Sequence, residues 1–272
     1  KYLMGKNLYE VCIDVLGESE AKYLENSHPY YSEIFIMNAY DALVSFKNDL
    51  NENLQFYCLD QGLSQITKNM YNECLENDCN FKFNLLFNNS KFDDKTKRFH
   101  STLRDKDNNI VLITSNYLIL AIDGKSFQKI NLSNFDKYMS QKQLKFKDLQ
   151  KSISVQPLLR TYAKYIKSND LAWLKNINKT VTNDKIKFII PISDSIVMIS
   201  YTDGKYAKYW YNKIVSFTQK EELNKSLLKI FPDKNISTKP IYIKNYYWEQ
   251  GASYWTNNID SKKYIDIISK PT

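Results

Sequence analysis

Glycine is scarce in this chain, and its positions exclude the common loops that bind nucleotide phosphates. Only six glycines occur in 272 residues, at positions 5, 17, 62, 124, 204 and 251. A phosphate-binding loop needs several glycines in one short turn, because its backbone N–H groups approach the phosphates closely. No GxGxxG or Walker sequence can be assembled here, so we expect no phosphate-binding loop within this chain.

The composition is that of a globular protein. Hydrophobic residues make up 43% of the chain and charged residues 25%, and a chain of this length buries a large core as one or two domains. No apolar run approaches the roughly 20 residues of a membrane-spanning helix, and the first six residues lack the apolar centre of a signal peptide. We therefore expect an intracellular protein with no membrane partner.

The positive net charge does not by itself indicate nucleic-acid binding. The formal charge is +8 and the pI is near 9.0, but lysines are spread along the whole chain and interleaved with Asp and Glu. Scattered charge of this kind is typical of a solvated surface, whereas nucleic-acid binding favours a clustered basic stripe. We do not expect nucleic acid to be the partner.

Cysteine and histidine show no metal-binding pattern. No two cysteines form a CxxC pair, and the two histidines are far apart with no second ligand at metal spacing. The sequence predicts free thiols and no zinc site, from Cys12, Cys58, Cys74, Cys79, His28 and His100.

The first fifty residues have helical spacing of apolar positions. Residues 7–16 form one apolar face, and Gly17 follows where a helix would end. The segment 18–26 has a second helical pattern, and residues 32–50 predict one longer helix.

The middle of the chain alternates between strand and helix patterns. Residues 54–59 predict a strand, and Ser64 is placed to cap the helix that follows. Alternation and turn residues then predict a β-meander over 81–87, 96–103 and 110–113. Continuous apolar character predicts a buried strand at 117–122, and Ser126 is expected to cap a short helix.

The last part also combines strands with helices. Residues 131–152 are polar and predict a surface connection. Strands are predicted at 155–166, 186–192, 195–201 and 241–248, and helices at 205–215 and 219–230. Thr218 with Glu221 has the spacing of a capping box. The fold class predicted from the whole chain is α+β with a mixed sheet.

Residues 246–255 have an unusual concentration of aromatic side chains around a step of small residues. The segment reads Tyr-Tyr-Trp-Glu-Gln-Gly-Ala-Ser-Tyr-Trp. The small pair allows close backbone approach and the rings offer stacking faces, a combination that suits a flat ring. A buried edge strand is the structural alternative.

Four segments, in this order, resemble the flavin-containing amine oxidoreductase family, which includes monoamine oxidases, polyamine oxidases and histone lysine demethylases. The first has Gln61 where the family has a glycine, and the second has Asp123 where the family has proline. Residues 199–210 are also similar to members of this group from large DNA viruses. The four segments are 56–66, 115–123, 156–165 and 248–254.

The resemblance implies site residues for FAD and for an amine substrate. Arg160 stands at the position of the family's active-site lysine, and Tyr254 matches one aromatic wall of its substrate site. Ser253 stands where monoamine oxidases carry the cysteine that bonds to the flavin, which implies noncovalent FAD. The residues implied to bind the cofactor are Gly62, Asp123, Trp248, Gly251 and Ser253. Packing in the core is the alternative for Tyr254 and Trp248.

Among the positions that differ from the family's pattern, Arg160 has the largest chemical consequence. A guanidinium stays charged, is planar and prefers bidentate anions, so it does not replace a lysine that holds a water near the flavin. Ordinary amine oxidation is therefore in question. Arg160 is expected to hold a carboxylate substrate or the flavin, or to pair with an acidic neighbour in a structural salt bridge.

The resemblance also implies a domain plan for a central portion of a longer protein. In that family the GxGxxG unit comes earlier and a segment that closes over the flavin comes later. Residues 1–53 are expected to be the helical part of the substrate domain, and 54–150 part of a discontinuous FAD-binding domain. Residues 151–245 then supply the sheet and helices of the substrate domain, and 246–272 return into the FAD-binding domain.

Three functions remain open from the sequence. The first is an FAD-dependent amine oxidoreductase-like protein, active or degenerate, that acts on a small-molecule amine. The second is a noncatalytic protein that reuses the fold and binds assembly partners, such as a virion component. The third is a basic nucleic-acid-binding module, in which tyrosines stack on bases and lysines neutralise phosphates. The location implied is cytoplasmic or virion-associated.

Overall fold

The computed structural model describes residues 1–49, 59–135, 145–165, 177–193, 195–232, 240–256 and 259–268. The chain divides into two compact units. The larger unit comprises residues 1–45, 123–128 and 148–272, and the smaller unit comprises 46–122 and 129–147. The assignment of segments to a substrate domain and an FAD-binding domain stays a prediction.

The larger unit begins with short helices that match two of the predicted ones. They are α1 (Leu8–Leu16) and α2 (Glu18–Ser27). Asn7 and Glu10 form a capping box at the start of α1. Gly17 ends the helix with φ 103°, a left-handed conformation that favours glycine, as the sequence predicted.

The predicted single helix over residues 32–50 is wrong, because Asn38 interrupts it. Two helices occupy this segment, α3 (Tyr31–Phe35) and α4 (Ala39–Asp49). Asn38 is buried, and its side-chain oxygen accepts a hydrogen bond of 3.0 Å from the backbone N–H of Asp41. An asparagine that bonds to the backbone in this way starts a new helix instead of continuing the old one.

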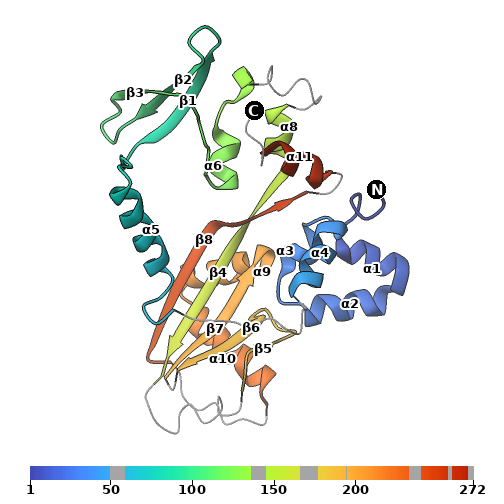
Figure 1. The fold of residues 1–272 in the computed structure, drawn as a ribbon. Coiled ribbons are helices and arrows are strands. Elements are labelled where there is room, and N and C mark those ends of the chain that lie inside the picture. Colours follow the sequence, from blue (N-terminus) through green and yellow to red (C-terminus); the bar gives the residue numbers. More distant parts are fainter. Residues whose placement is uncertain are drawn as a thin grey trace. The chain divides into compact units, whose positions relative to one another are not determined.

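A five-stranded sheet forms the centre of the larger unit (Figure 1). Its strands are in the order β5-β6-β7-β4-β8, and every named pair is antiparallel. The predicted mixed sheet is therefore wrong for the described strands, whose parallel contact is the isolated bridge Lys187↔Tyr201. The strands are β4 (Ile153–Lys164), β5 (Thr180–Val181), β6 (Phe188–Ser193), β7 (Ile196–Asp203) and β8 (Tyr242–Trp255).

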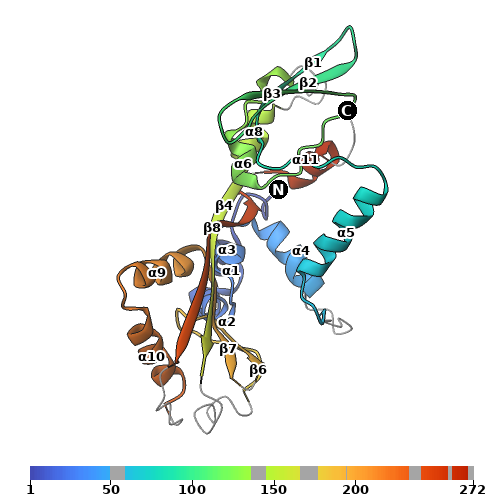
Figure 2. The same cartoon turned by 90° about the vertical axis from the view of Figure 1, so that its left-hand side faces the viewer.

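Helices α9 (Gly204–Val215) and α10 (Gln219–Ile230) cover one face of this sheet, as Figure 2 shows with the sheet seen nearly edge-on. The core beneath them contains Leu159, Val197 and Ile199 from the strands, and Trp210 and Leu223 from the helices. Side chains i and i+2 of a strand share a face, so this core draws on one face of β4 and β7.

The predicted capping box before α10 is wrong. Thr218 occupies the N-cap position, but its backbone angles are φ −100° and ψ 2°, and its side chain makes no capping hydrogen bond. A capping side chain normally starts from an extended backbone, which brings its oxygen over the first turn.

Three short helices complete the larger unit: α6 (Gly124–Lys129), α8 (Phe146–Lys151), whose first two residues belong to the smaller unit, and α11 (Ser261–Ile268). Asp123, not Ser126, caps α6, because its carboxylate accepts from the backbone N–H groups of Lys125 and Ser126. The sequence did not predict α11, which is joined to Asp41 through a hydrogen bond from Ser261 Oγ.

The smaller unit contains α5 (Ser64–Glu76), the 3₁₀ helix η1 (Ser133–Phe135) and an antiparallel meander. Leu63, not Ser64, occupies the N-cap position of α5. The predicted meander is confirmed, but its first strand begins at Leu86 and not at Phe81. The strands are β1 (Leu86–Asp93), β2 (Arg98–Arg104) and β3 (Ile110–Ser115).

The predicted buried strand at 117–122 is wrong. No described strand pairs with this segment, and Tyr117 and Ile119 are 82% and 86% exposed. Apolar character alone does not distinguish a buried strand from an extended segment that lacks a neighbour. The strand predicted at 54–59 lies outside the described residues except for Leu59, which is not in a strand.

Asp203 joins the N-terminal helices to the sheet. It ends β7 with a fully buried carboxylate that accepts hydrogen bonds from the backbone N–H groups of Tyr31 and Ser32, at 2.7 and 2.9 Å. These donors lie in the first turn of α3, where helix N–H groups have no intrahelical partner and the helix dipole favours an anion. Burial raises the pKa of Asp203, and the hydrogen bonds to Ser32 and Tyr31 oppose that shift.

Lys187 makes a second connection to the same helices. Its side chain is 2% exposed, and its ammonium donates to the backbone oxygens of Glu25 and His28 at the end of α2, at 3.0 and 3.4 Å. These carbonyls belong to the negative end of the helix, which a cation stabilises. Burial lowers the pKa of Lys187.

We predict that Asp203→Ala lowers the free energy of unfolding by about 2 to 4 kcal/mol, because two buried N–H donors lose a charged acceptor. Urea denaturation measures this loss. Asp107→Ala, in an exposed turn, is the control and should change stability by less than about 0.5 kcal/mol. An equal effect of both substitutions would contradict the role of Asp203.

Lys187→Met should change how stability depends on alkaline pH. Because the folded pKa of Lys187 lies below 10.5, the unfolded state binds more protons between the folded pKa and that value. The contribution of Lys187 to stability therefore increases as pH rises through this window. The unfolding free energy of the wild type minus that of Lys187→Met should therefore increase with pH in urea titrations. A difference that does not change with pH would exclude the burial effect.

Candidate functional site

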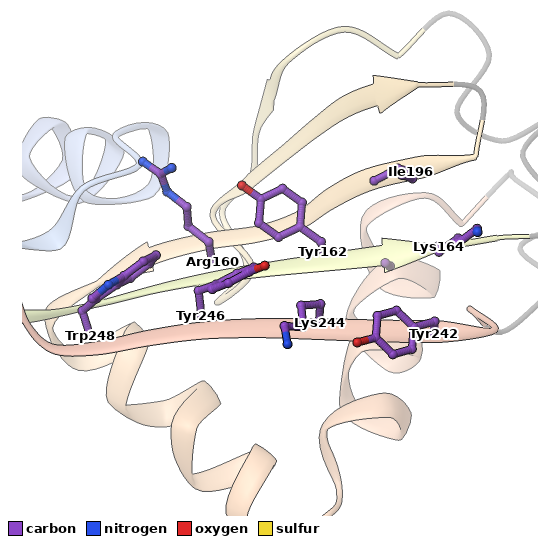
Figure 3. Close-up of a pocket in the computed structure, with 9 residues that line it drawn as sticks. Arg160, Tyr162, Lys164, Ile196, Tyr242, Lys244, Tyr246 and Trp248 are labelled. Carbon is purple, nitrogen blue, oxygen red and sulfur yellow. The ribbon is translucent and has the colours of Figure 1, made fainter. Parts of the chain in front are cut away.

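An open groove lies on the face of the five-stranded sheet opposite α9 and α10 (Figure 3). Its volume is about 520 Å³, and its lining contains cationic and aromatic side chains but no carboxylate. The groove exists because β4 and β8 alternate between a face packed on helices and a face that is open. The lining residues are Arg160, Tyr162, Ala163, Lys164, Ile196, Tyr242, Lys244, Tyr246 and Trp248.

Arg160 lies on β4 beside the aromatic residues of the groove. Its guanidinium carbon is 4.6 Å from the ring centre of Tyr201, and Nη2 donates to the Tyr201 hydroxyl at 3.4 Å. No described carboxylate pairs with Arg160, and no described residue accepts from its buried Nε. Burial opposes the charge, but hydrogen bonding to Tyr201 holds the pKa of Arg160 above its ordinary value. The structural salt bridge considered for Arg160 is therefore absent from the described part of the chain.

The Tyr201 ring packs against two other aromatic rings, those of Tyr30 and Phe188. Tyr30 meets Tyr201 edge-on at 5.5 Å, and Phe188 contacts both rings, at 5.5 Å from Tyr30 and 5.9 Å from Tyr201. Burial, followed by the neighbouring Tyr201, raises the pKa of Tyr30. These three rings form an aromatic platform. Within it, Tyr201 contacts Arg160, and its ring face attracts the guanidinium.

Trp248 and Tyr246 form the aromatic wall on β8. Their rings are nearly parallel, with centres 6.0 Å apart and planes at 16°. Tyr162 of β4 meets Tyr246 edge-on at 5.9 Å. Trp248 is 43% exposed and Tyr246 is 45% exposed, so both keep ring surface available to a ligand.

Tyr254, the other predicted catalytic residue, does not line the groove. It is half-buried, and burial, with the charges of Asp203 and Glu33 next in order, raises its pKa. Tyr201 also raises this pKa. The groove therefore brings together Arg160 and Trp248 but not Tyr254.

Gly251 serves the packing of β8 on β4. A Cβ at this position would lie 2.3 Å from Leu158 Cβ and 3.2 Å from Trp248 Cβ. The register between β4 and β8 shifts between Gln156 and Leu158, opposite this glycine. Close strand approach at a bulge is a common reason for glycine in a strand.

Asp123 and Ser253, two predicted cofactor residues, are both close to Gly124: Asp123 precedes it in the sequence, and Ser253 packs against it. A Cβ on Gly124 would be 2.6 Å from Ser253 Oγ. The carboxylate of Asp123 is engaged by Lys125 and Ser126, and the side-chain hydrogen bond with Ser126 is the first cause that lowers its pKa. Both positions are thus explained by the packing and capping of α6.

Gly62, the remaining predicted cofactor residue, lies in the smaller unit just before α5. Its φ of 80° is in the left-handed region, and a Cβ there would meet no atom within 4 Å. The glycine is therefore needed for backbone conformation and leaves open space around it.

Sequence reasoning did not name the lining residues Tyr162, Lys244 and Tyr246 as site residues, and it did not name Tyr201, which contacts Arg160. The signal was present in the alternation of residues 242–248, where every second side chain is aromatic or cationic. Period two places these side chains on one face of a strand.

Neither a candidate metal cluster nor a candidate membrane-spanning helix occurs in the part of the chain that the structure describes. No cluster of three or more His, Cys, Asp and Glu side chains there has metal-binding geometry. None of its helices has the length and apolar character required to cross a bilayer.

The fold of this chain has counterparts in solved structures. Cyclohexylamine oxidase from Brevibacterium oxydans IH-35A matches with a TM-score of 0.63 at 10% identity, over 99% of this chain and 60% of that one. A putrescine oxidase with redesigned cofactor binding matches with a TM-score of 0.64 at 14% identity, over 94% and 58%. A protein described as a putative protoporphyrinogen oxidase from Exiguobacterium sp. 255-15 matches with a TM-score of 0.60 at 12% identity, over 97% and 58%.

The chain has the fold of part of an amine oxidase. It spans about 60% of the length of these structures. The resemblance to the flavin-containing amine oxidoreductases is thereby confirmed at the level of fold. No protein-family model and no curated protein sequence matches the chain.

Because β8 packs closely on Leu158 of β4 at Gly251, Gly251→Ala should be destabilising. We expect a loss of about 1 to 3 kcal/mol in urea denaturation, because the new methyl group overlaps Leu158. Glu249→Ala, an exposed substitution on the same strand, is the matched control. In the double variant Gly251→Ala, Leu158→Gly, the atom that the new methyl group overlaps is gone. We therefore expect the double variant to lose less stability than the sum of the two single losses, and a loss equal to that sum would show that the contact is unimportant.

Proposed function

We propose that this chain is the substrate-side portion of an FAD-dependent amine oxidoreductase-like protein. The observation that carries the proposal is the groove of Arg160, Tyr246 and Trp248 on the open face of a sheet with the amine oxidase fold. The rings of Tyr246 and Trp248 are exposed and nearly parallel. Arg160 lies in the same groove and has no carboxylate partner among the described residues. Together these side chains form a binding surface.

The residues present fit the ring system of FAD and not its phosphates. Trp248 offers an exposed ring face on β8, and Arg160 offers a cation beside it. No glycine-rich loop in the sequence can hold a pyrophosphate. Trp248 is thus the residue that would lie next to the flavin ring, Arg160 would stay available to a substrate, and other parts of a longer protein would bind the nucleotide.

The chain's own residues would orient a substrate in this site. A bound flavin supplies the chemistry, which is hydride removal from a C–N bond. Tyr162, Tyr246 and Trp248 restrict a substrate to the space above the sheet and exclude water from it. Arg160, Lys164 and Lys244 disfavour an ammonium group, so an amine would bind here in its unprotonated form. Ser253 has no thiol, which is consistent with noncovalent FAD.

A noncatalytic protein with the same fold is the second candidate, and a specific observation favours it. Asp123, Gly251 and Ser253 have packing or capping roles in the described structure. Their presence therefore does not require a cofactor. In a protein with an assembly function, including one in a virion, these residues would keep their packing and capping roles. Arg160 would then take no part in catalysis.

The test of the proposal is the visible absorbance spectrum of the protein purified from the cells that produce it naturally, followed by peroxide release with a panel of primary amines. Flavin bands and amine-dependent peroxide are expected. A colourless protein that assembles into larger particles would replace the oxidoreductase with the noncatalytic candidate. Steeply salt-dependent binding of DNA or RNA would support the basic-module alternative.

Tyr254→Ala and Tyr254→Phe test the wall predicted at this position. If Tyr254 orients substrate through its ring, Tyr254→Ala should reduce kcat/KM by about a hundredfold or more, which corresponds to about 3 kcal/mol. Tyr254→Phe keeps the ring and should retain most of the activity. Flavin content, measured by absorbance, should be unchanged in both. Full activity of Tyr254→Ala would remove Tyr254 from the site.

A further inference from the structure

The charges of the groove indicate what its ligand carries. Arg160, Lys164 and Lys244 lie in the lining, and the lining contains no Asp or Glu. Three cations at one concave surface attract an anion and repel an ammonium ion. The ligand chemistry that complements this surface is therefore negative.

The two best-positioned cations are held on aromatic rings. Arg160 lies over Tyr201 at 4.6 Å, and Lys244 Nζ lies 5.7 Å from the centre of the Tyr246 ring. Arg160 is partly buried and is restrained by Tyr201. A guanidinium restrained in this way loses little side-chain entropy when it binds a planar carboxylate through two hydrogen bonds.

The aromatic wall adds a requirement for a flat apolar ring. Trp248 and Tyr246 stack on each other and are each more than 40% exposed. Their centre-to-centre distance of 6.0 Å leaves no room for a third ring between them, so a ligand ring would lie on an outer face of the stack.

We propose that the groove binds a small aromatic carboxylate, with its acidic group on Arg160 and its ring on Trp248. This deepens the proposed function and rests on it for one point, namely that the bound molecule is a substrate. The substrate of the oxidoreductase would then carry a carboxylate beside its amine. The binding itself does not depend on a flavin.

Three ligands that share one ring test the proposal on the 272-residue chain by isothermal titration calorimetry. They are indole-3-acetate, its neutral amide indole-3-acetamide, and the cationic tryptamine. We expect indole-3-acetate to bind at least about tenfold more tightly than the amide, which is the effect of one charge-assisted hydrogen bond. Tryptamine is expected to bind most weakly.

Two variants separate the contributions of charge and ring. Arg160→Gln should abolish the preference for indole-3-acetate over its amide, and Arg160→Lys should retain part of it. Trp248→Ala should weaken both ligands by a similar factor and leave the preference intact. Lys220→Gln, an exposed substitution on α10, is the control and should change neither. Circular dichroism and the urea midpoint verify that each variant is folded.

Tryptamine binding as tight as indole-3-acetate binding would overturn the proposal, as would an undiminished preference in Arg160→Gln or no binding of any ligand to the wild-type chain. These outcomes are distinct from failure of the proposed function. A colourless protein whose groove still prefers the carboxylate would refute the oxidoreductase and keep the binding site. A flavoprotein whose groove prefers tryptamine would support the oxidoreductase and refute the carboxylate site.

Discussion

The fully buried carboxylate of Asp203 connects segments that are 172 positions apart in the sequence, and the open face of the sheet depends on this connection. It caps α3 from the end of β7, and Lys187 caps α2 from the start of β6. Each contact satisfies one end of a helix with the charge that its dipole favours. Together they fix the N-terminal helices beside β7, where Tyr30 contacts Tyr201 and Phe188. The aromatic platform under Arg160 is thus a consequence of how the helices are attached.

The position of Arg160 also follows from the sheet. Leu159 and Thr161 face the covered side and are fully buried, whereas Arg160 faces the groove. The residues opposite Arg160 in the neighbouring strands are Tyr201 and Tyr246. The Arg160 guanidinium stays charged without a carboxylate partner, and the ring face and hydroxyl oxygen of Tyr201 stabilise it. The groove therefore remains positive, and this charge distinguishes it from a site suited to ammonium groups.

The sequence predicted the larger elements because their signals are local. The apolar spacing of α1 and the left-handed requirement at Gly17 are contained within the segment itself, and the same is true of the strands β4 and β7. The errors have two causes: a capping bond within the segment that the apolar pattern does not show, and the lack of a described partner strand. Asn38 breaks a helix through a buried capping bond, and residues 117–122 lack the neighbouring strand that a buried strand requires. The candidate residues Arg160 and Trp248 were named from local motifs, whereas Tyr201 comes beside Arg160 through strand pairing, which no local motif reveals.

Adjacent residues of β8 have different neighbours, and this has a consequence for how the protein can change during evolution. Tyr246 faces the groove, whereas Tyr247 packs on the helix side and stacks with Tyr211 of α9 at 4.2 Å. Ligand preference and helix attachment are thus encoded on alternate positions of one strand. Selection for a new ligand can alter one set of side chains without disturbing the other. In homologous chains, we expect variation along this strand to alternate, with helix-facing positions conserved in volume and groove-facing positions free to diversify.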